Sequence, residues 1–253
     1  MEQSLKGRTA LVTGGAVGIG AAIATALARE GANVAVTYRT HAPSDELLAD
    51  LASGSLQPPL VMQLDATLED DVMSVARQFS DKVGQLDILV NNVGGLVKRS
   101  HIADMPFRLW KEVLAVNLDS TFLVTHHLLP ILSRGNGRII NVASLAGRNG
   151  GHPGATAYAA SKAALFGFTR GLSKELAAEG ITVNALAPGF IEATPFHDTF
   201  TTAESKQATI STIPVGRAGL PADVASAALW LASEHAAFVT GTVIDINGGQ
   251  YFG

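Results

Sequence analysis

Short apolar runs rich in β-branched residues alternate along this chain with longer stretches of helical periodicity. Such alternation predicts repeated β–α–β units, in which helices cover both faces of a parallel sheet. Right-handed crossovers then favour a doubly wound topology. The predicted strands are Thr9–Thr13, Asn33–Thr37, Leu60–Leu64, Leu86–Val90, Arg138–Val142, Thr182–Leu186 and Thr242–Ile246. The sequence therefore predicts a three-layer α/β fold around a seven-stranded parallel sheet.

Helical patterns fill the intervals between these strands, and one segment interrupts the rhythm. The predicted helices are Ile19–Glu30, Pro43–Ala52, Leu68–Val83, Trp110–Leu132, Ala157–Ala178 and Pro221–Ala232. No linker divides residues 1–253, so we expect a single domain. Residues 189–217 are rich in Thr and Phe and follow a strand, which makes them a candidate substrate lid. The lid side chains that suit an apolar or mixed substrate are Phe190, Phe196, His197 and Phe200.

Composition narrows the class of protein. The 253 residues are 47% hydrophobic, carry a net charge of −4 and contain no cysteine. Disulfides, thiolate metal sites and cysteine nucleophiles are thereby excluded, and no other metal-ligand cluster is visible. Scattered basic residues argue against nucleic acid as a partner. The polar N-terminus and the lack of an apolar run of ~18 residues predict a cytoplasmic protein without a membrane partner.

A glycine loop follows the first predicted strand. The segment Thr13–Gly20 reads Thr-Gly-Gly-Ala-Val-Gly-Ile-Gly and opens the next helix. Glycine leaves room for a pyrophosphate, and a helix N-terminus offers free N–H groups and partial positive charge. A tight turn without ligand is the alternative, but the position after the first strand of a doubly wound chain favours the dinucleotide of a Rossmann fold.

The end of the second strand predicts which dinucleotide is preferred. An acid at this position binds the ribose hydroxyl of NAD, whereas an arginine accommodates the phosphate of NADP. The chain has no acid there and carries Arg39, so NADP(H) is the preferred cofactor and NAD(H) remains possible. A solvated surface arginine is the alternative. Asp65, after the third strand, either meets the adenine amino group or caps the helix that follows.

Four polar residues form a candidate catalytic set. Tyr158 and Lys162 lie four residues apart on a predicted helix, hence on one face. A nearby ammonium lowers a tyrosine pKa, which suits proton transfer to a carbonyl oxygen. Ser144 ends a strand and can hold that oxygen. Asn117 interrupts a helical run in which asparagine is unfavourable, and this invites a functional interpretation.

These motifs together resemble the short-chain dehydrogenases/reductases, and the resemblance runs from end to end. The matching segments are Thr13–Gly20, Asn91-Asn92-Val93-Gly94, Asn117, Ser144, Tyr158-x-x-x-Lys162, Pro188-Gly189 and Asn247-Gly248-Gly249. The resemblance implies that Tyr158 is the general acid/base and that Ser144 positions the carbonyl. Lys162 would bind the nicotinamide ribose and lower the tyrosine pKa, while Asn117 would hold a water in a proton relay.

The resemblance also implies the residues that contact the cofactor. The expected cofactor residues are Gly14, Gly15, Val17, Gly18, Ile19, Gly20, Arg39, Asp65, Ala66, Asn91, Val93, Gly94, Tyr158, Lys162, Pro188, Gly189, Ile191 and Thr194. Ala193 stands where the family commonly has threonine, so the part played by Thr194 is left open. Many family members are homotetramers, and we expect the aromatic tail Gln250–Gly253 to pack between subunits.

Within the family, the segments Pro188–Glu192 and Val243–Tyr251 look most like those of the 3-oxoacyl-(acyl-carrier-protein) reductases. Members that use the carrier protein present arginines beside the active-site mouth. At the corresponding positions this chain has Gly135 and Glu179, with Arg134 adjacent, so the carrier protein stays open as a partner.

The expected function is therefore the NADPH-linked reduction of a small ketone, of 3-oxoacyl or similar type, to a secondary alcohol. An NAD-linked alcohol or sugar dehydrogenase is the alternative. A non-catalytic dinucleotide sensor is a remote one, since such a protein would be expected to lose Tyr158 or Lys162.

Overall fold

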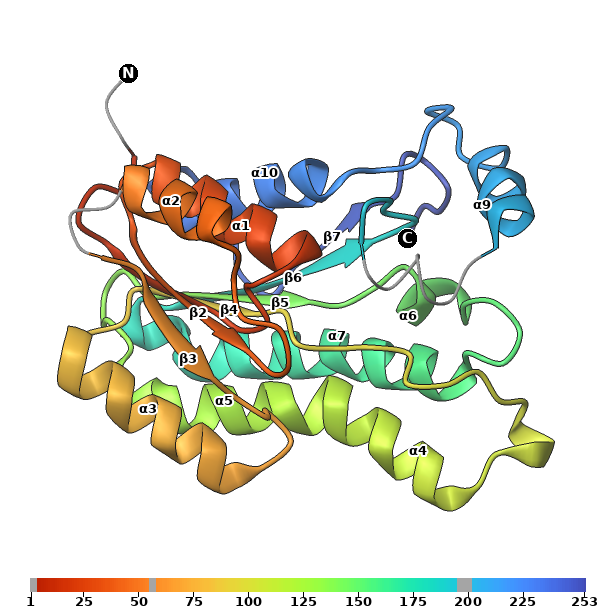
Figure 1. Cartoon of the computed structure of the whole chain (residues 1–253), viewed down its shortest axis with the longest axis horizontal. Helices are drawn as coiled ribbons and strands as arrows, with labels where there is room; N and C mark the ends of the chain where they lie inside the picture. The colour runs from red at the N-terminus through yellow and green to blue at the C-terminus, as the bar shows by residue number, and fades with distance from the viewer. Residues whose placement is uncertain (1–3, 55–57, 195–201) are drawn as a thin grey trace.

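A single twisted sheet of parallel strands forms the middle layer of the molecule (Figure 1). The computed structural model describes residues 4–54, 58–194 and 202–253. Its strands are β1 Thr9–Val12, β2 Asn33–Tyr38, β3 Leu60–Gln63, β4 Ile88–Asn91, β5 Arg138–Val142, β6 Thr182–Pro188 and β7 Val243–Ile246. They are ordered β3-β2-β1-β4-β5-β6-β7 and every pair is parallel. The prediction of a seven-stranded, doubly wound parallel sheet is confirmed.

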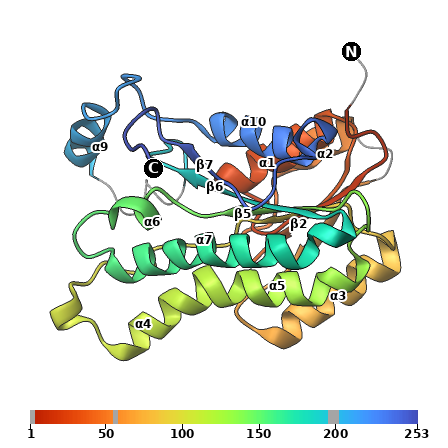
Figure 2. The same ribbon diagram turned by 180° about the vertical axis from the view of Figure 1, so that it is seen from behind.

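Helices cover both faces of this sheet. The helices are α1 Gly18–Arg29, α2 Asp45–Ser53, α3 Glu69–Val83, α4 Phe107–Leu114, α5 Ser120–Leu128, α6 Ala146–Asn149, α7 Thr156–Leu176, α9 Ala203–Ile210 and α10 Pro221–Ala232. One face carries α1, α2 and α10, and the other carries α3, α4, α5 and α7, as the two opposite views agree (Figures 1 and 2). Helices α6 and α9 lie beyond the ends of β6 and β7.

Alternation along each strand divides the core between the two faces. Val12 on β1 packs into the cluster beneath α1 and α10, whereas its neighbour Leu11 packs into the cluster beneath α3 and α5. Ile139 and Ile140 on β5 divide in the same way. Because successive side chains of a strand point to opposite faces, strands covered on both sides are apolar throughout. This explains why the sequence shows continuous apolar runs.

The helix expected over Trp110–Leu132 is interrupted. It begins earlier, at Phe107, and a π-helical turn over Ala115–Asp119 separates α4 from α5. The cause is Asn117, whose Nδ2 donates to the carbonyl of Val113 at 2.9 Å and to that of Gly95 at 2.8 Å. A side chain that bonds to nearby carbonyls competes with regular helical pairing. The helices α6 and α9 were not anticipated from the sequence.

The chain segments at the two ends of the candidate lid are paired with each other. Ile191 forms a parallel bridge with Gly219, and the N–H of Gly219 donates to the carbonyl of Phe190 at 2.9 Å. Residues 203–210 form α9. The predicted lid residues Phe196, His197 and Phe200 lie outside the described residues, so their placement in the lid stays a prediction.

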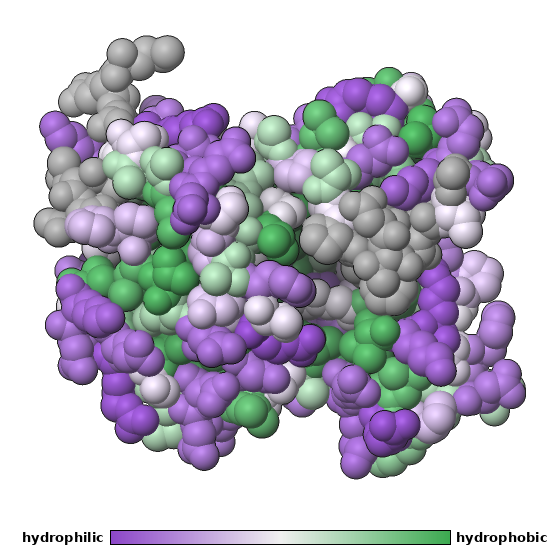
Figure 3. Space-filling model, viewed as in Figure 1, coloured by the Kyte–Doolittle hydropathy of each residue, from purple (hydrophilic) through white to green (hydrophobic). Residues whose placement is uncertain are grey.

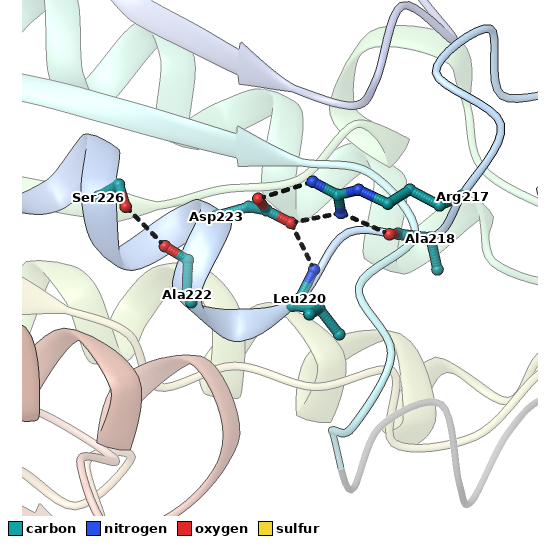
Figure 4. A network of polar contacts seen from close by, with 6 residues as sticks. All are labelled: Arg217, Ala218, Leu220, Ala222, Asp223 and Ser226. Atoms are coloured by element: carbon teal, nitrogen blue, oxygen red, sulfur yellow. Dashed lines mark hydrogen bonds and ion pairs between the residues drawn. The ribbon is translucent and has the colours of Figure 1, made fainter.

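A polar network joins Arg217, at the end of the candidate lid, to the start of α10 (Figure 4). Both Nη atoms of Arg217 donate to the carboxylate of Asp223, at 2.8 and 3.0 Å, and Asp223 also accepts from the N–H of Leu220 at 2.8 Å. The latter bond satisfies a backbone donor at the start of α10. The hydrogen bonds from Arg217 and Leu220 lower the pKa of Asp223 to about 2.

Replacing Asp223 should therefore destabilise the protein at neutral pH. We expect Asp223→Ala to reduce the free energy of unfolding in urea by about 1 kcal/mol, the typical cost of losing a helix cap. Ser226→Ala on the same helix removes only a bond to the carbonyl of Ala222 and should change stability by less than about 0.5 kcal/mol. Because the pKa of Asp223 is lowered, the difference between wild type and Asp223→Ala should persist above about pH 4 and vanish as the pH falls through 2. Equal stability of both variants at pH 7 would contradict this role.

Candidate active site

A large cavity opens at the carboxyl ends of the strands. Its volume is about 1080 Å³, and residues that follow β1 through β6 line it. In the space-filling view the surface is notched between the lobe of α1 and α2 and the lobe of α9 (Figure 3). The strand order reverses at β1, where crossovers leave in opposite directions, and ligands of doubly wound folds bind at such a switch point.

The glycine loop forms one wall of the cavity. A Cβ atom on Gly20 would lie only 2.3 Å from the carbonyl oxygen of Gly14, so this close approach requires glycine. Helix α1 begins immediately after the loop, at Gly18, without a side-chain cap and without an acid in its first turn. Its first N–H groups are thus free to bind an anion. The glycine cradle, the uncapped helix and the cavity volume together fit a dinucleotide.

The loop after β4 is held against this wall by Asn92. Its Nδ2 donates to the carbonyls of Thr13 and Gly14 at 3.0 and 3.1 Å, and Asn92 lines the cavity. The residue expected from the sequence to contact the cofactor is its neighbour Asn91, and that contact stays a prediction. Asn91 lies under the sheet, where its amide donates to Thr125 and Asn141, and it does not line the cavity. Strand alternation places the two asparagines on opposite sides, and this signal could have found Asn92.

The second strand brings Arg39 to the far end of the cavity, as expected. Arg39 is exposed and lines the cavity together with Asp65. Asp65 Oδ1 accepts from the hydroxyl and the N–H of Thr67, at 2.6 and 3.0 Å. Burial acts to raise the pKa of Asp65, but these bonds and the charge of Arg39 hold it below its usual value. Asp65 thus braces the turn before α3 and still borders the cavity, so the two alternatives for this residue are compatible.

Tyr158 and Ser144 meet at the opposite end of the cavity. Tyr158 comes from the first turn of α7 and Ser144 from the residues after β5, and their hydroxyl groups are hydrogen-bonded. Ser144 Oγ also accepts from the N–H of Ala146 at 3.1 Å, which fixes its position. Both side chains line the cavity.

Lys162 lies one turn further along α7 and is almost completely buried. Its Nζ donates to the carbonyl of Val142 at 2.8 Å and lies 5.9 Å from the centre of the Tyr158 ring. Burial lowers the pKa of Lys162 to about 7. Burial also raises the pKa of Tyr158, and the hydrogen bond with Ser144 only partly opposes this. In the chain alone burial therefore governs the pKa of Tyr158, and the lowering of this pKa by Lys162 stays a prediction.

Asn117 stands behind the cavity rather than in its wall. It is fully buried, accepts from the N–H of Gly95 at 2.9 Å and donates to the carbonyl of the same residue. A Cβ on Gly94 would lie 2.8 Å from both Asn117 Oδ1 and Lys162 Nζ, so the loop passes directly over them. Through these contacts Asn117 positions the loop at Gly94 and Gly95. It lies in a π-helical turn, and such turns are frequent at functional sites.

Of the remaining expected cofactor residues, all but Gly15 line the cavity. Gly15 does not line the cavity, because its backbone packs against Val36 on β2. Ala193 adopts a left-handed φ of 55°, and Thr194 then lines the cavity and donates to the carbonyl of Ile191 at 3.1 Å. The other expected residues that line the cavity are Gly14, Val17, Gly18, Ile19, Gly20, Ala66, Val93, Gly94, Pro188, Gly189 and Ile191.

The arginine positions beside the active-site mouth require a correction. Gly135 and Glu179 directly precede β5 and β6, so they lie at the amino ends of the strands, opposite the cavity. The adjacent Arg134 forms an ion pair with Glu179 at 2.6 Å. In a parallel sheet, residues before a strand and residues after it lie at opposite edges. These positions therefore do not border the cavity of their own chain.

Two further features concern metals and membranes. Within residues 4–54, 58–194 and 202–253, no group of three or more His, Asp or Glu side chains is placed to hold a metal ion. In the same part of the chain, no helix is long and apolar enough to cross a bilayer.

Comparison with known proteins places this architecture in a family. A family model described as enoyl-(acyl carrier protein) reductase matches residues 14–250. The 3-oxoacyl-[acyl-carrier-protein] reductase FabG of Vibrio cholerae is 38% identical over 98% of this chain and 99% of its own length. That of Thermotoga maritima is 40% identical over 97% of this chain and 98% of its own length.

Solved structures agree with the sequence relatives. A short-chain dehydrogenase/reductase of Brucella melitensis, described as a glucose/ribitol dehydrogenase, is similar with a TM-score of 0.89, 32% identity and 100% coverage of both chains. The chain therefore belongs to the short-chain dehydrogenase/reductase family, whose members are oxidoreductases that use a nicotinamide dinucleotide.

Proposed function

We propose that this enzyme reduces a small ketone of 3-oxoacyl or similar type to a secondary alcohol, with NADPH as the preferred cofactor. The observation that carries the proposal is the hydrogen-bonded pair Tyr158–Ser144 at the inner end of a dinucleotide-sized cavity. The relatives from Vibrio cholerae and Thermotoga maritima are named as 3-oxoacyl reductases, which favours reduction over an NAD-linked dehydrogenase. The intact Tyr158 and Lys162 argue against a non-catalytic sensor.

The protonation states of the chain's own residues suit the reductive direction. Burial raises the pKa of Tyr158, so its phenol keeps the proton at neutral pH. A protonated phenol can donate to the alkoxide that develops as a ketone is reduced. Ser144, held by the N–H of Ala146, can bind the same oxygen. Lys162, with a pKa of about 7, is placed behind the tyrosine to restore a proton. When bound, the dinucleotide supplies the hydride.

The cofactor would lie along the glycine loop, with its adenosine end toward Arg39 and its reactive end toward Tyr158. This orientation is supported by the two ends of the cavity, since Arg39 follows β2 and Tyr158 begins α7. The substrate is proposed to be a free small molecule. Arg134, the cation beside the positions where carrier-protein enzymes have arginines, is already paired with Glu179.

Tyr158→Phe should abolish most of the turnover. The substitution removes the proton donor while leaving the ring, so we expect kcat to fall by ~10²- to 10⁴-fold with unchanged NADPH affinity. Steady-state kinetics with a 3-oxoester and fluorescence titration of NADPH measure the two quantities. Tyr251→Phe, which does not line the cavity, is the matched control. Turnover of Tyr158→Phe within tenfold of wild type would refute the assignment.

Arg39→Asp should reverse the cofactor preference. A guanidinium that meets a phosphate gains roughly 1.5–3 kcal/mol, which is about a ten- to hundredfold preference for NADPH in kcat/KM. Salt and exposure favour the lower value. Arg77→Asp, on the exposed surface of α3, changes the charge equally but away from the cavity and should keep the preference. An unchanged NADPH/NADH ratio in Arg39→Asp would show that Arg39 points into solvent.

A homotetramer is the proposed assembly. Phe252 in the C-terminal tail is 86% exposed in the isolated chain and Phe238 is fully exposed, so neither ring has cover within its own chain. Subunit packing of the tail would supply it. Multi-angle light scattering at micromolar concentration should give four times the 26.2 kDa chain mass. A monomeric mass would contradict this proposal.

A further inference from the structure

A strained turn lies in the wall of the cavity that Ser144 and Tyr158 also line. The N–H of Lys98 donates to the carbonyl of Leu96 at 2.7 Å, which closes a γ-turn around Val97. Val97 has a φ of 62° there. Left-handed backbone is a genuine outlier for a β-branched residue, and γ-turns with positive φ are rare. Such strain persists only where the surroundings impose it, and it concentrates at functional sites.

The residues after this turn are fastened to the segment that leads into α7. The N–H of Ser100 donates to the carbonyl of Gly154 at 3.0 Å. Gly154 has a φ of 79°, and a Cβ there would lie 3.3 Å from the Cβ of Arg99. The backbone beneath Arg99 is thus fixed relative to the helix that carries Tyr158. The turn and the fastening together determine where Arg99 stands.

Arg99 lines the cavity but has little to hold its charge. Among the described residues, its side chain forms one hydrogen bond, from Nη1 to the carbonyl of Pro153 at 3.4 Å. In the described part of the chain no carboxylate lies within 4 Å of it, although Glu112 also lines the cavity. Other arginines, such as Arg134 and Arg217, are ion-paired. An arginine left with free donors inside a cavity offers a fork that matches a carboxylate or a phosphate.

We propose that Arg99 binds an anionic group of the substrate, while the reacting carbonyl meets Ser144 and Tyr158. The inference rests on the proposed ketone reduction and specifies its substrate as a small oxo compound that bears a carboxylate or phosphate. Lys162, the other cation at this end, is committed to the carbonyl of Val142 and to the catalytic pair. Arg99 is therefore the group available to recognise charge on the substrate.

The test compares substrates that differ in one charge. Acetoacetate and its methyl ester form a carboxylate pair, and dihydroxyacetone phosphate and dihydroxyacetone form a phosphate pair. Each is assayed with the wild-type enzyme and NADPH, and the charged-to-neutral ratio of kcat/KM is recorded. We expect a ratio of about ten to a hundred in at least one pair, as charge-assisted hydrogen bonds supply. The pair that shows it identifies carboxylate or phosphate as the recognised group.

Three variants test whether Arg99 causes the charged-to-neutral ratio of kcat/KM. Arg99→Met should bring it to about one, and Arg99→Lys should retain part of it, because the charge remains while the fork is lost. Lys98→Met removes the neighbouring charge, which is exposed and outside the cavity, and should keep the wild-type ratio. Thermal unfolding and NADPH titration establish that each variant is folded.

Calorimetry measures how the same four compounds bind to the complex of the enzyme with NADP⁺. It therefore gives the preference for the charged compound without turnover. Charge preference in binding without any turnover would overturn the proposed reduction and keep the anion site. Turnover with ratios near one in both pairs would overturn the anion site and keep the reduction. A ratio that survives in Arg99→Met would also overturn the assignment. Absence of both turnover and charge-dependent binding would overturn both.

Discussion

The buried amino group of Lys162 is the point on which the active-site arrangement depends. It donates to the carbonyl of Val142 at the end of β5, and the loop at Gly94 passes too close to it to admit any side chain. Asn117 reaches the same loop from the π-helical turn. Strand, loop, interrupted helix and α7 therefore converge on one titratable atom. Its desolvation lowers the pKa to about 7, so its charge responds to what binds beside it.

The framework around this point was predictable because it follows from strong local signals. Continuous apolar runs with two-sided alternation predict buried parallel strands, and the sheet places them as expected. The glycine loop and the Tyr158–Lys162 spacing are equally local patterns. Parallel strands bring their carboxyl ends to one edge, so Gly14, Ser144 and Pro188, distant in sequence, line one cavity. The topology of the sheet thus brings short motifs that are distant in sequence together in one site.

Contacts between distant residues were harder to predict. The motif at Asn91 and Asn92 gives a pair of residues, and strand alternation decides which of the two lines the cavity. The interruption at Asn117 depends on Gly95, which lies far away in sequence. The burial that raises the pKa of Tyr158 in the chain alone was not predictable, because a sequence shows the neighbouring charge but not the desolvation. Arg99 escaped notice because its significance lies in the partners that it lacks among the described residues.

The charge on Lys162 can be measured directly. Selective ¹⁵N labelling of lysine and NMR titration of the purified enzyme without added dinucleotide would follow each amino group, and Lys162→Met would identify the signal. We expect Lys162 to titrate near pH 7, well below the ordinary lysine value of 10.5. Addition of a bound anion should raise this midpoint, because a negative charge nearby favours the ammonium. A midpoint near 10.5 in the enzyme alone would contradict a desolvated lysine at the centre of the site.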